Sequence, residues 1–200
     1  MAGKTYERQD RFYKKAKKEG YVARSAYKIV DFARQYKIFV PGQTVIDLGC
    51  SPGSWLQIAQ EKMKNQGLWI GLDLEDLSVP LAPGNAFFKG DFLSEAAQTW
   101  LEQQAPKGAD WVLSDMSPHL TGIRFKDQAQ MFELIEKAFA LCQKILRPHG
   151  NFLFKFFPSP EFDALKKDLQ KSFARVEIEK SAATRGSSNE FYMVCLDKKP

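Results

Sequence analysis

The chain has no apolar stretch that is long enough to cross a membrane. A membrane-spanning helix needs roughly 20 consecutive apolar residues, and no run in this sequence approaches that length. The first residues, M-A-G-K-T-Y-E-R, are polar and charged, unlike the apolar segment of a secretory signal. We therefore expect a cytoplasmic protein that does not bind membranes.

Cysteine and histidine are also scarce. Cys50, Cys142 and Cys195 are an odd, scattered set without the spacing of a zinc site or a disulfide framework. His119 and His149 fall in predicted loops, and we interpret both as surface residues rather than catalytic groups. The few, scattered cysteines and histidines fit a protein of a reducing compartment and predict no metal site.

Positive charge is concentrated near the N-terminus. Residues 1–40 hold 11 Lys+Arg and 4 Asp+Glu, a net of +7, whereas the other residues carry a net of −2. The basic residues are interleaved with aromatic ones, a pattern that suits RNA because phosphates and bases are both contacted. A solvated tail is the alternative. We expect residues 1–24 to form a basic RNA-binding arm, irregular or partly helical, with contacts from Lys14, Lys15, Lys17, Lys18 and Arg24, supplemented by Arg124 and Arg185.

Residues 25–200 are predicted to form a single domain. Strands are expected from Thr44 onward and over 68–72, 86–89, 110–114, 151–157, 175–180 and 190–196, and helices over 25–36, 54–66, 94–104, 127–146 and 160–173. Ser25 is the expected N-cap of the first helix, and Gly67 the expected C′ residue of the second. This alternation indicates an α/β fold with a doubly wound sheet.

One stretch, from Thr44 to Trp55, combines a buried strand, a glycine-containing turn and the start of a helix. It reads T-V-I-D-L-G-C-S-P-G-S-W. Ligands of open α/β sheets bind at such turns, but the phosphate-loop pattern is missing, and Ser51 stands where a dinucleotide fingerprint needs its middle glycine. S-adenosylmethionine (SAM), whose sulfonium is a cation, is the third interpretation. An ordinary strand-to-helix connection stays an alternative.

Four aspartates end or follow predicted strands: Asp47, Asp73, Asp91 and Asp115. Parallel strands would bring their carboxylates to one edge of the sheet. Such a cluster is costly unless cations or hydrogen-bond donors offset it, and SAM offers a sulfonium, an amino group and ribose hydroxyls. Asp73 lies one strand after the turn, where an acid could bind those hydroxyls. The four together favour a ligand site over four separate structural turns.

Lys155 interrupts the apolar strand F-L-F-K-F-F at the same predicted edge. A lysine there must reach solvent, pair with an acid or take part in chemistry, and the nearby aspartates favour chemistry. Lys28 lies close to the apolar positions of its helix, and composition alone explains it as a surface lysine.

These segments resemble the FtsJ/RrmJ family of RNA ribose 2′-O-methyltransferases over nearly the whole chain. The resembling runs are K-K-A-K-K-E-G-Y-V-A-R-S-A-Y-K, V-I-D-L-G-C-S-P-G-S-W, L-S-D-M-S-P, F-L-F-K-F-F and T-R-G-S-S-N-E-F-Y-M-V. The family's fold is a seven-stranded, mostly parallel, Rossmann-like sheet with helices on both faces and an antiparallel last strand. The sequence departs from the family pattern in Pro-Gly-Ser-Trp, where Pro-Gly-Gly-Trp is common, and in Lys180-Ser181, where Lys-Pro is common.

The resemblance implies roles for particular residues. The catalytic tetrad would be Lys28, Asp115, Lys155 and Glu190. Cofactor contacts would come from Gly53, Trp55, Asp73, Asp91 and Asp115. The methyl donor would be SAM without a metal, and the expected partner is ribosomal RNA, at a uridine of 23S RNA within the large subunit, acted on by a monomer. Transfer RNA is an alternative substrate, and a non-catalytic RNA-binding relative is an alternative function.

The implied reaction is attack of a ribose 2′ oxygen on the sulfonium methyl group, with neutral S-adenosylhomocysteine leaving. Lys155 is the candidate base, or it stays charged and orients the hydroxyl; the sequence leaves both open. A SAM enzyme for small molecules or proteins would need neither the two lysines nor the basic arm. A nicotinamide dehydrogenase is least favoured, because the glycine spacing fails.

Overall fold

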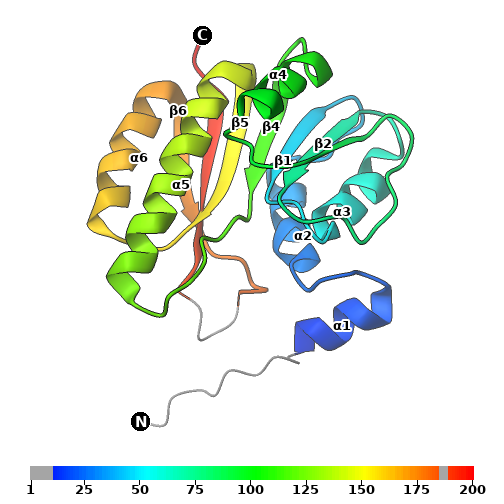
Figure 1. Cartoon of the computed structure of the whole chain (residues 1–200), viewed down its shortest axis with the longest axis horizontal. Helices are drawn as coiled ribbons and strands as arrows, with labels where there is room; N and C mark the ends of the chain where they lie inside the picture. The colour runs from blue at the N-terminus through cyan, green and yellow to red at the C-terminus, as the bar shows by residue number, and fades with distance from the viewer. Residues whose placement is uncertain (1–10, 185–188) are drawn as a thin grey trace.

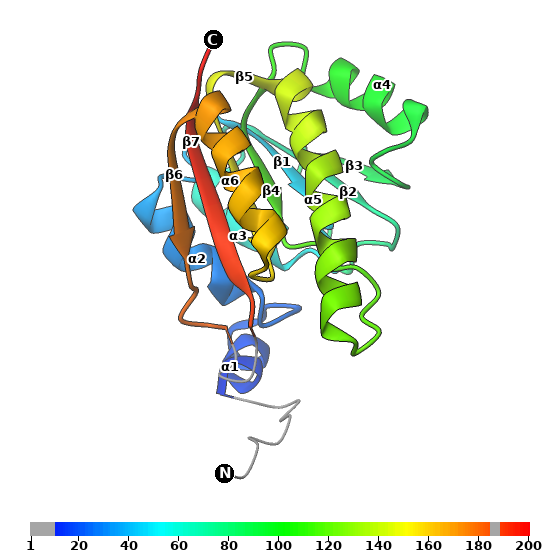
Figure 2. The same ribbon diagram turned by 90° about the vertical axis from the view of Figure 1, so that its left-hand side faces the viewer.

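The computed structural model describes residues 11–184 and 189–200, and a seven-stranded sheet lies at its centre. The strands lie in the order β3-β2-β1-β4-β5-β7-β6 (Figures 1 and 2). β7 runs antiparallel to both of its neighbours, β5 and β6, whereas the other strand pairs are parallel. The strands are β1 (Thr44–Leu48), β2 (Leu68–Asp73), β3 (Ala86–Lys89), β4 (Ala109–Ser114), β5 (Leu146–Phe156), β6 (Phe173–Glu179) and β7 (Phe191–Lys198). The predicted doubly wound sheet with an antiparallel last strand is confirmed.

Helices cover both faces of the sheet (Figure 2). α2 (Ala26–Gln35) and α3 (Ser54–Met63) share a core with Trp69 and Trp111, whereas α4 (Glu95–Gln104), α5 (Arg124–Ile145) and α6 (Pro160–Ser172) share one with Phe152 and Phe154. All residues of β4 are buried, as expected for a strand covered on both faces. No helix within the described ranges is long and apolar enough to span a membrane.

One predicted helix end is wrong, and one predicted N-cap residue is confirmed in position but makes no capping hydrogen bond. The helix predicted over 54–66 ends at Met63, because Lys64 and Asn65 have φ angles of 51° and 59°, in the left-handed region. Gly67 is therefore not its C′ residue. Ser25 directly precedes α2 but makes no side-chain cap; its hydroxyl instead lies 2.7 Å from the hydroxyl of Ser54, at the start of α3.

α5 and β5 both begin earlier than predicted. α5 starts at Arg124, three residues before the expected start, so the R-F-K part of the predicted loop is helical. β5 starts at Leu146 and includes the turn around Gly150. Neither difference moves Asp115 or Lys155 from the carboxyl edge of the sheet.

α1 (Arg11–Glu19) is the described part of the predicted basic arm, and residues 1–10 lie outside the described residues. Its buried Ala16 packs with Tyr27 and Ala183, and the ring of Phe12 lies 5.6 Å from that of Tyr27. The four lysines of α1 are exposed. The expected partial helicity is confirmed, and the helix is packed against the domain.

Candidate active site

The carboxylate of Asp115, directly after β4, is the centre of a charged network at the carboxyl edge of the sheet. Lys28 Nζ, from α2, lies 3.4 Å from both of its oxygens. Lys155 Nζ, from β5, lies 3.2 Å from Asp115 Oδ1 and donates to the Asp115 carbonyl oxygen at 2.6 Å. Glu190 Oε1, just before β7, lies 2.9 Å from Lys28 Nζ. The structure thus brings together the four residues of the predicted tetrad, which are up to 162 positions apart (28 to 190).

Tyr192 belongs to the same network and was missed by sequence reasoning. Its fully buried side chain donates a hydrogen bond from the hydroxyl to Asp115 Oδ1 at 2.8 Å. The contact arises because Tyr192 lies opposite Lys155 in the β5–β7 ladder. The available sequence signal was its position two residues after Glu190, which places both side chains on one face of an extended chain.

The charges in this network shift the pKa values of its members. Burial alone would raise the pKa of Asp115, but Lys155 and Lys28 outweigh it, so the pKa lies below its ordinary value of 3.8. Burial alone would lower the pKa of Lys28, but Asp115 and Glu190 outweigh it and raise the pKa above 10.5. Lys28 and Asp115 are therefore both charged at neutral pH.

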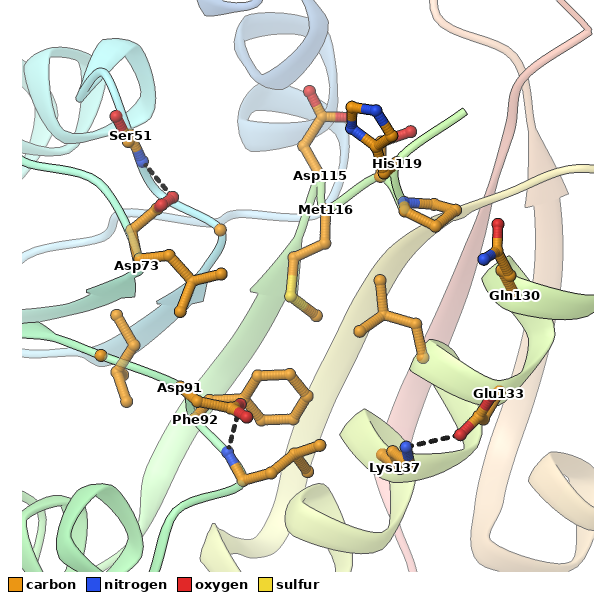
Figure 3. A pocket seen from close by; sticks show the side chains of 18 residues that line it. Ser51, Asp73, Asp91, Phe92, Asp115, Met116, His119, Gln130, Glu133 and Lys137 are labelled. Atoms are coloured by element: carbon orange, nitrogen blue, oxygen red, sulfur yellow. Dashed lines mark hydrogen bonds and ion pairs between the residues drawn. The ribbon is translucent and has the colours of Figure 1, made fainter. Parts of the chain in front are cut away.

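A cavity of about 630 Å³ opens beside Asp115, within the usual range of ligand sites, roughly 300 to 1,000 Å³. It runs from the turn after β1, past the ends of β2 and β3, to α5 (Figure 3). Asp73, Asp91 and Asp115 line it, together with apolar side chains such as Phe92 and Met116. Three of the four predicted carboxylates therefore share one cavity.

Backbone groups hold the carboxylates of Asp73 and Asp91 in place (Figure 3). Asp73 accepts hydrogen bonds from Ser51 N at 2.8 Å and from Glu75 N at 2.9 Å. Asp91 accepts one from Leu93 N at 2.9 Å. Each carboxylate oxygen keeps a second acceptor position, so both side chains can also accept hydrogen bonds from hydroxyl or amino groups of a ligand.

Asp47, the fourth aspartate, lies within β1 and is buried. It is not among the residues that line the cavity, and its Oδ2 has no hydrogen-bond partner in the described part of the structure. Burial raises its pKa well above 3.8, and the charges of Asp115 and Asp73 raise it further. Burial and the two neighbouring carboxylates thus disfavour the charged form of Asp47, and the prediction that it belongs to the carboxylates of the cavity is wrong.

Gly53 and Trp55 also lie outside the lining of the cavity. Gly53 precedes α3 with φ of +105°, and a Cβ there would lie 2.4 Å from Val79 Cγ2. The buried indole of Trp55 donates from Nε1 to Ser25 O at 2.9 Å. In this structure both residues position α3, and their cofactor contacts stay a prediction.

The cavity fits SAM in two further respects. Gly49 lines it with φ of +75°, and a Cβ there would lie 2.4 Å from Met116 Cγ, so only glycine lets the turn pass so closely. The buried Oε1 of Gln130, which also lines the cavity, has no hydrogen-bond partner within residues 11–184 and 189–200. Amino or hydroxyl groups of a ligand could donate to it.

Other predicted contact residues are spread more widely. Arg24 is half-buried, and its guanidinium donates to the carbonyl of Ala183. Arg124 is exposed at the start of α5, and Arg185 lies outside the described residues. His119 is exposed, as predicted, but it also lines the cavity.

Comparisons with known proteins identify the family of the chain. A sequence profile of FtsJ-like methyltransferases matches residues 21–198. Ribosomal RNA large subunit methyltransferase E of Nitrosomonas europaea is 45% identical over 94% of this chain and 91% of that protein. Its namesake in Bdellovibrio bacteriovorus is 38% identical over 98% of this chain and 100% of that protein. A crystal structure of a Plasmodium falciparum protein, assigned as a ribosomal RNA methyltransferase, matches with a TM-score of 0.79 and 25% identity, covering 89% of this chain and 98% of that chain. The chain belongs to the FtsJ-like methyltransferase family.

Proposed function

We propose that this methyltransferase transfers a methyl group from SAM to a ribose 2′-hydroxyl of ribosomal RNA in the large subunit. The observation that carries the proposal is the network in which Lys155 and Lys28 both contact Asp115, at the rim of the acidic cavity. Relatives at 45% and 38% identity are named as ribosomal RNA large subunit methyltransferases. They support the choice of substrate.

The cavity residues would hold SAM. Asp73 would accept hydrogen bonds from the ribose hydroxyls, and Asp91 and Gln130 would accept them from amino groups. When bound, SAM supplies an electrophilic methyl group on a sulfonium, and its product is neutral. Asp115 lines the cavity and contacts both lysines, so it would lie between bound SAM and the ribose 2′-hydroxyl that accepts the methyl group.

Lys155 would position the attacking hydroxyl. Its Nζ donates to the carbonyl oxygen of Asp115 and lies close to Asp115 Oδ1, which leaves a third ammonium hydrogen for the substrate. A hydrogen bond from Lys155 Nζ would orient the 2′ oxygen and stabilise the negative charge that develops there, while the hydroxyl proton passes to solvent as the bond to the methyl group forms and the bond from methyl to sulfur breaks. Fixed geometry alone contributes about 7 kcal/mol or more in favourable cases.

Lys28 and Glu190 would complete the environment of Lys155. Lys28 bridges the two carboxylates, with Nζ 3.4 Å from Asp115 and 2.9 Å from Glu190. Two cations and two anions thus balance in a part of the protein where an unpaired charge is costly. Lys28 would also keep Asp115 ionised and fixed against Lys155.

The basic arm would bind the RNA backbone. The exposed lysines of α1 lie at the same end of the molecule as the carboxyl edge of the sheet (Figures 1 and 2). Contacts of lysines with phosphates carry little sequence information and weaken with salt. We therefore assign residues 1–24 to substrate affinity and residues 25–200 to the methyl transfer.

The test is transfer of label from SAM to three undermethylated substrates: large ribosomal subunits, free ribosomal RNA and transfer RNA. We expect label in the large subunit, mapped to a 2′-O-methyl group on a uridine of 23S RNA. Label only in transfer RNA would keep the chemistry and replace the substrate. Binding of SAM without label in any RNA would refute the proposal and leave a methyltransferase for another acceptor, or a non-catalytic RNA-binding relative.

A further inference from the structure

An exposed apolar surface lies beside the cavity, on the segment that joins β4 to α5. Leu120, Ile123 and Phe125 are 54%, 50% and 76% exposed. Phe125 is the most exposed large apolar side chain of the described residues. We call residues 120–126 the β4–α5 segment. Scattered apolar side chains are common on surfaces, so exposure alone does not mark a binding site.

The segment is fixed by hydrogen bonds to the side chain of Asp127. Its Oδ1 accepts from Thr121 N at 2.7 Å and from Thr121 Oγ1 at 2.8 Å, and its Oδ2 accepts from Gly122 N at 3.1 Å. These bonds hold the turn before α5. The exposed aromatic ring at Phe125 is therefore presented from a well-defined helix start.

Two cations flank this ring, at positions that do not favour the helix. Arg124 and Lys126 are exposed in the first turn of α5. The N-terminus of a helix carries partial positive charge, so cations there are unfavourable and anions are favourable. Both cations would be stabilised by an anionic partner. Local rules of helix stability are broken most often where a function requires it.

The position of the segment connects it to the reaction. His119, directly before it, lines the cavity, and Asp115 lies only a few residues earlier. Figures 1 and 2 show the start of α5 and α1 at the same end of the molecule, on different sides of the carboxyl edge. Positive charge therefore lies on both sides of the network around Asp115.

We propose that the β4–α5 segment binds unpaired nucleotides next to the target ribose. Phe125 stacks on a base, and Arg124 and Lys126 contact the adjoining phosphates. An aromatic ring between cations matches the alternation of bases and phosphates in single-stranded RNA, in which bases are free to stack. This inference rests on the proposed function and extends it, because it places substrate on the side of the site opposite α1.

The experiment measures the affinity of the full-length protein for a labelled single-stranded RNA, and the KM for undermethylated large subunits. Phe125→Ala should weaken RNA binding by roughly tenfold, the effect of one lost stacking contact, with an unchanged salt slope and unchanged SAM affinity. Phe125→Trp should restore binding, whereas Phe125→Leu should not. Val40→Ala is the matched control, since Val40 is 41% exposed in the turn that precedes β1.

The cations have a separate readout. Arg124→Gln with Lys126→Gln should reduce the slope of log affinity against log salt by about 1.4, from two lost phosphate contacts at roughly 0.7 each. The thermal stability should stay equal or rise slightly, because the unfavourable interaction with the helix is removed. Lys107→Gln is the control, an exposed lysine in the turn before β4.

Three outcomes would overturn the inference. If the wild-type protein methylates large subunits but Phe125→Ala behaves like Val40→Ala, the segment has no role, and the proposed function still stands. If Phe125→Leu restores affinity, the contact is apolar without stacking. If Phe125→Ala raises KM for subunits but binds protein-free RNA normally, the partner is a ribosomal protein. A wild-type protein that neither binds RNA nor transfers label refutes the proposed function itself.

Discussion

At the scale of single residues, the site depends on the carboxylate of Asp115. It contacts the ammonium groups of Lys28 and Lys155 and accepts a hydrogen bond from Tyr192. Glu190 supplies the second negative charge through Lys28. Removing one partner from a buried ionic group commonly costs about 3 to 5 kcal/mol. We therefore expect substitutions of Asp115 to lower stability and turnover together, and we use Lys155 and Tyr192 to measure the two effects separately.

Replacing Lys155 with alanine should reduce turnover by at least about 100-fold, the contribution expected of a group that holds or moves a proton. Lys155→Met, which keeps the apolar stem, should do the same. The affinity for SAM should stay near that of the wild type, because Lys155 does not line the cavity. Single-turnover methylation and a separate SAM-binding titration measure the two effects.

A matched control for this substitution is Lys198→Met. Lys198 Nζ also donates to carbonyl oxygens, those of Gln143 at 2.7 Å and Leu146 at 2.9 Å, but at the opposite edge of the sheet. The Lys198→Met substitution should leave turnover unchanged. Near-normal turnover in Lys155→Met would remove Lys155 from the mechanism.

Replacing Tyr192 with phenylalanine should destabilise the protein by about 1.5 to 3 kcal/mol, because a hydrogen bond to a charged group is lost in a buried place. The ring and its packing are kept. The pKa of Asp115 should rise, since the hydroxyl helps to hold it below 3.8. Urea denaturation measures the stability, and the pH dependence of turnover reports on Asp115.

Tyr36→Phe is the control for the loss of a tyrosine hydroxyl. The hydroxyl oxygen of Tyr36 lies 2.8 Å from Glu177 Oε2 and 2.7 Å from Glu179 Oε1, on the surface of β6, and its single hydrogen is donated to one of these carboxylates at a time. This variant should lose less stability and keep the wild-type pH profile of turnover. Equal effects of the two substitutions on that profile would argue against a role for Tyr192 in the site.

At the scale of helices and strands, hydrophobic patterns predicted the order and type of every element of the domain. Strand ends were accurate where glycine, proline or aspartate bounds an apolar run, as at β3, which spans Ala86–Lys89 as predicted. The end of α3 was not predicted accurately. Lys64 adopts a left-handed backbone conformation there, and a lysine gives no sequence signal for that conformation. Local sequence propensity determines boundaries such as the ends of β3, whereas tertiary context determines boundaries such as the end of α3.

The same distinction applies to the candidate site. Asp73, Asp91 and Asp115 were predictable because parallel strands bring their carboxyl ends together, whereas Asp47 lies within its strand and does not reach the cavity. The roles of Lys28 and Glu190 were predicted only from the family resemblance. The hydrophobic pattern of a helix does not indicate which of its lysines contacts the end of a particular strand. Tyr192 was missed because a buried aromatic residue in a strand looks like ordinary core. Its role depends on the register between β5 and β7, which the sequence does not specify locally.

The basic helix α1 has a prediction of its own. Changing Lys14, Lys17 and Lys18 to glutamine should raise the KM for RNA and lower the salt slope by about 2, from three phosphate contacts. The SAM affinity and the rate at saturating RNA should stay the same, because α1 contributes no residue to the cavity lining. Lys15 is left unchanged, since it lies 3.8 Å from Glu19 and over the ring of Tyr27.

The control for α1 changes three lysines of α6, namely Lys166, Lys167 and Lys171, to glutamine. These variants have the same change in net charge. An equal fall of the salt slope in both sets would mean that net charge, and not α1, governs RNA affinity.

At the scale of the whole molecule, the buried Asp47 and the half-buried Asp115 make the stability depend on pH in opposite directions. The folded-state pKa of Asp115 lies below 3.8, so its contribution is present above that pH and is lost as the pH falls through the lowered pKa. The pKa of Asp47 lies well above 3.8, so stability falls as the pH rises from about 4 toward the raised value. The folded protein thus contains, close together, one carboxylate whose ionisation stabilises the fold (Asp115) and one whose ionisation destabilises it (Asp47).

Asparagine substitutions separate these two effects. At pH 7, Asp47→Asn should be more stable than the wild type, and the difference should shrink as the pH approaches 4. Asp115→Asn should be less stable at pH 7, and its disadvantage should shrink below about pH 4. Urea denaturation curves from pH 3 to pH 7 measure both. A constant offset of either variant across this range would mean that the ionisation of that aspartate does not contribute.

The position of β7 between β5 and β6 has a consequence for a chain that is still being synthesised. The residues that line the cavity lie between Gly49 and Lys137, so the ribosome releases all of them before it reaches the last strand. Glu190 and Tyr192 are made later, and Tyr192 enters the sheet with β7, between two strands made earlier. A nascent chain would therefore carry every residue of the donor cavity before it can assemble the network around Asp115. Competence for methyl transfer would be acquired last, when the final strand inserts.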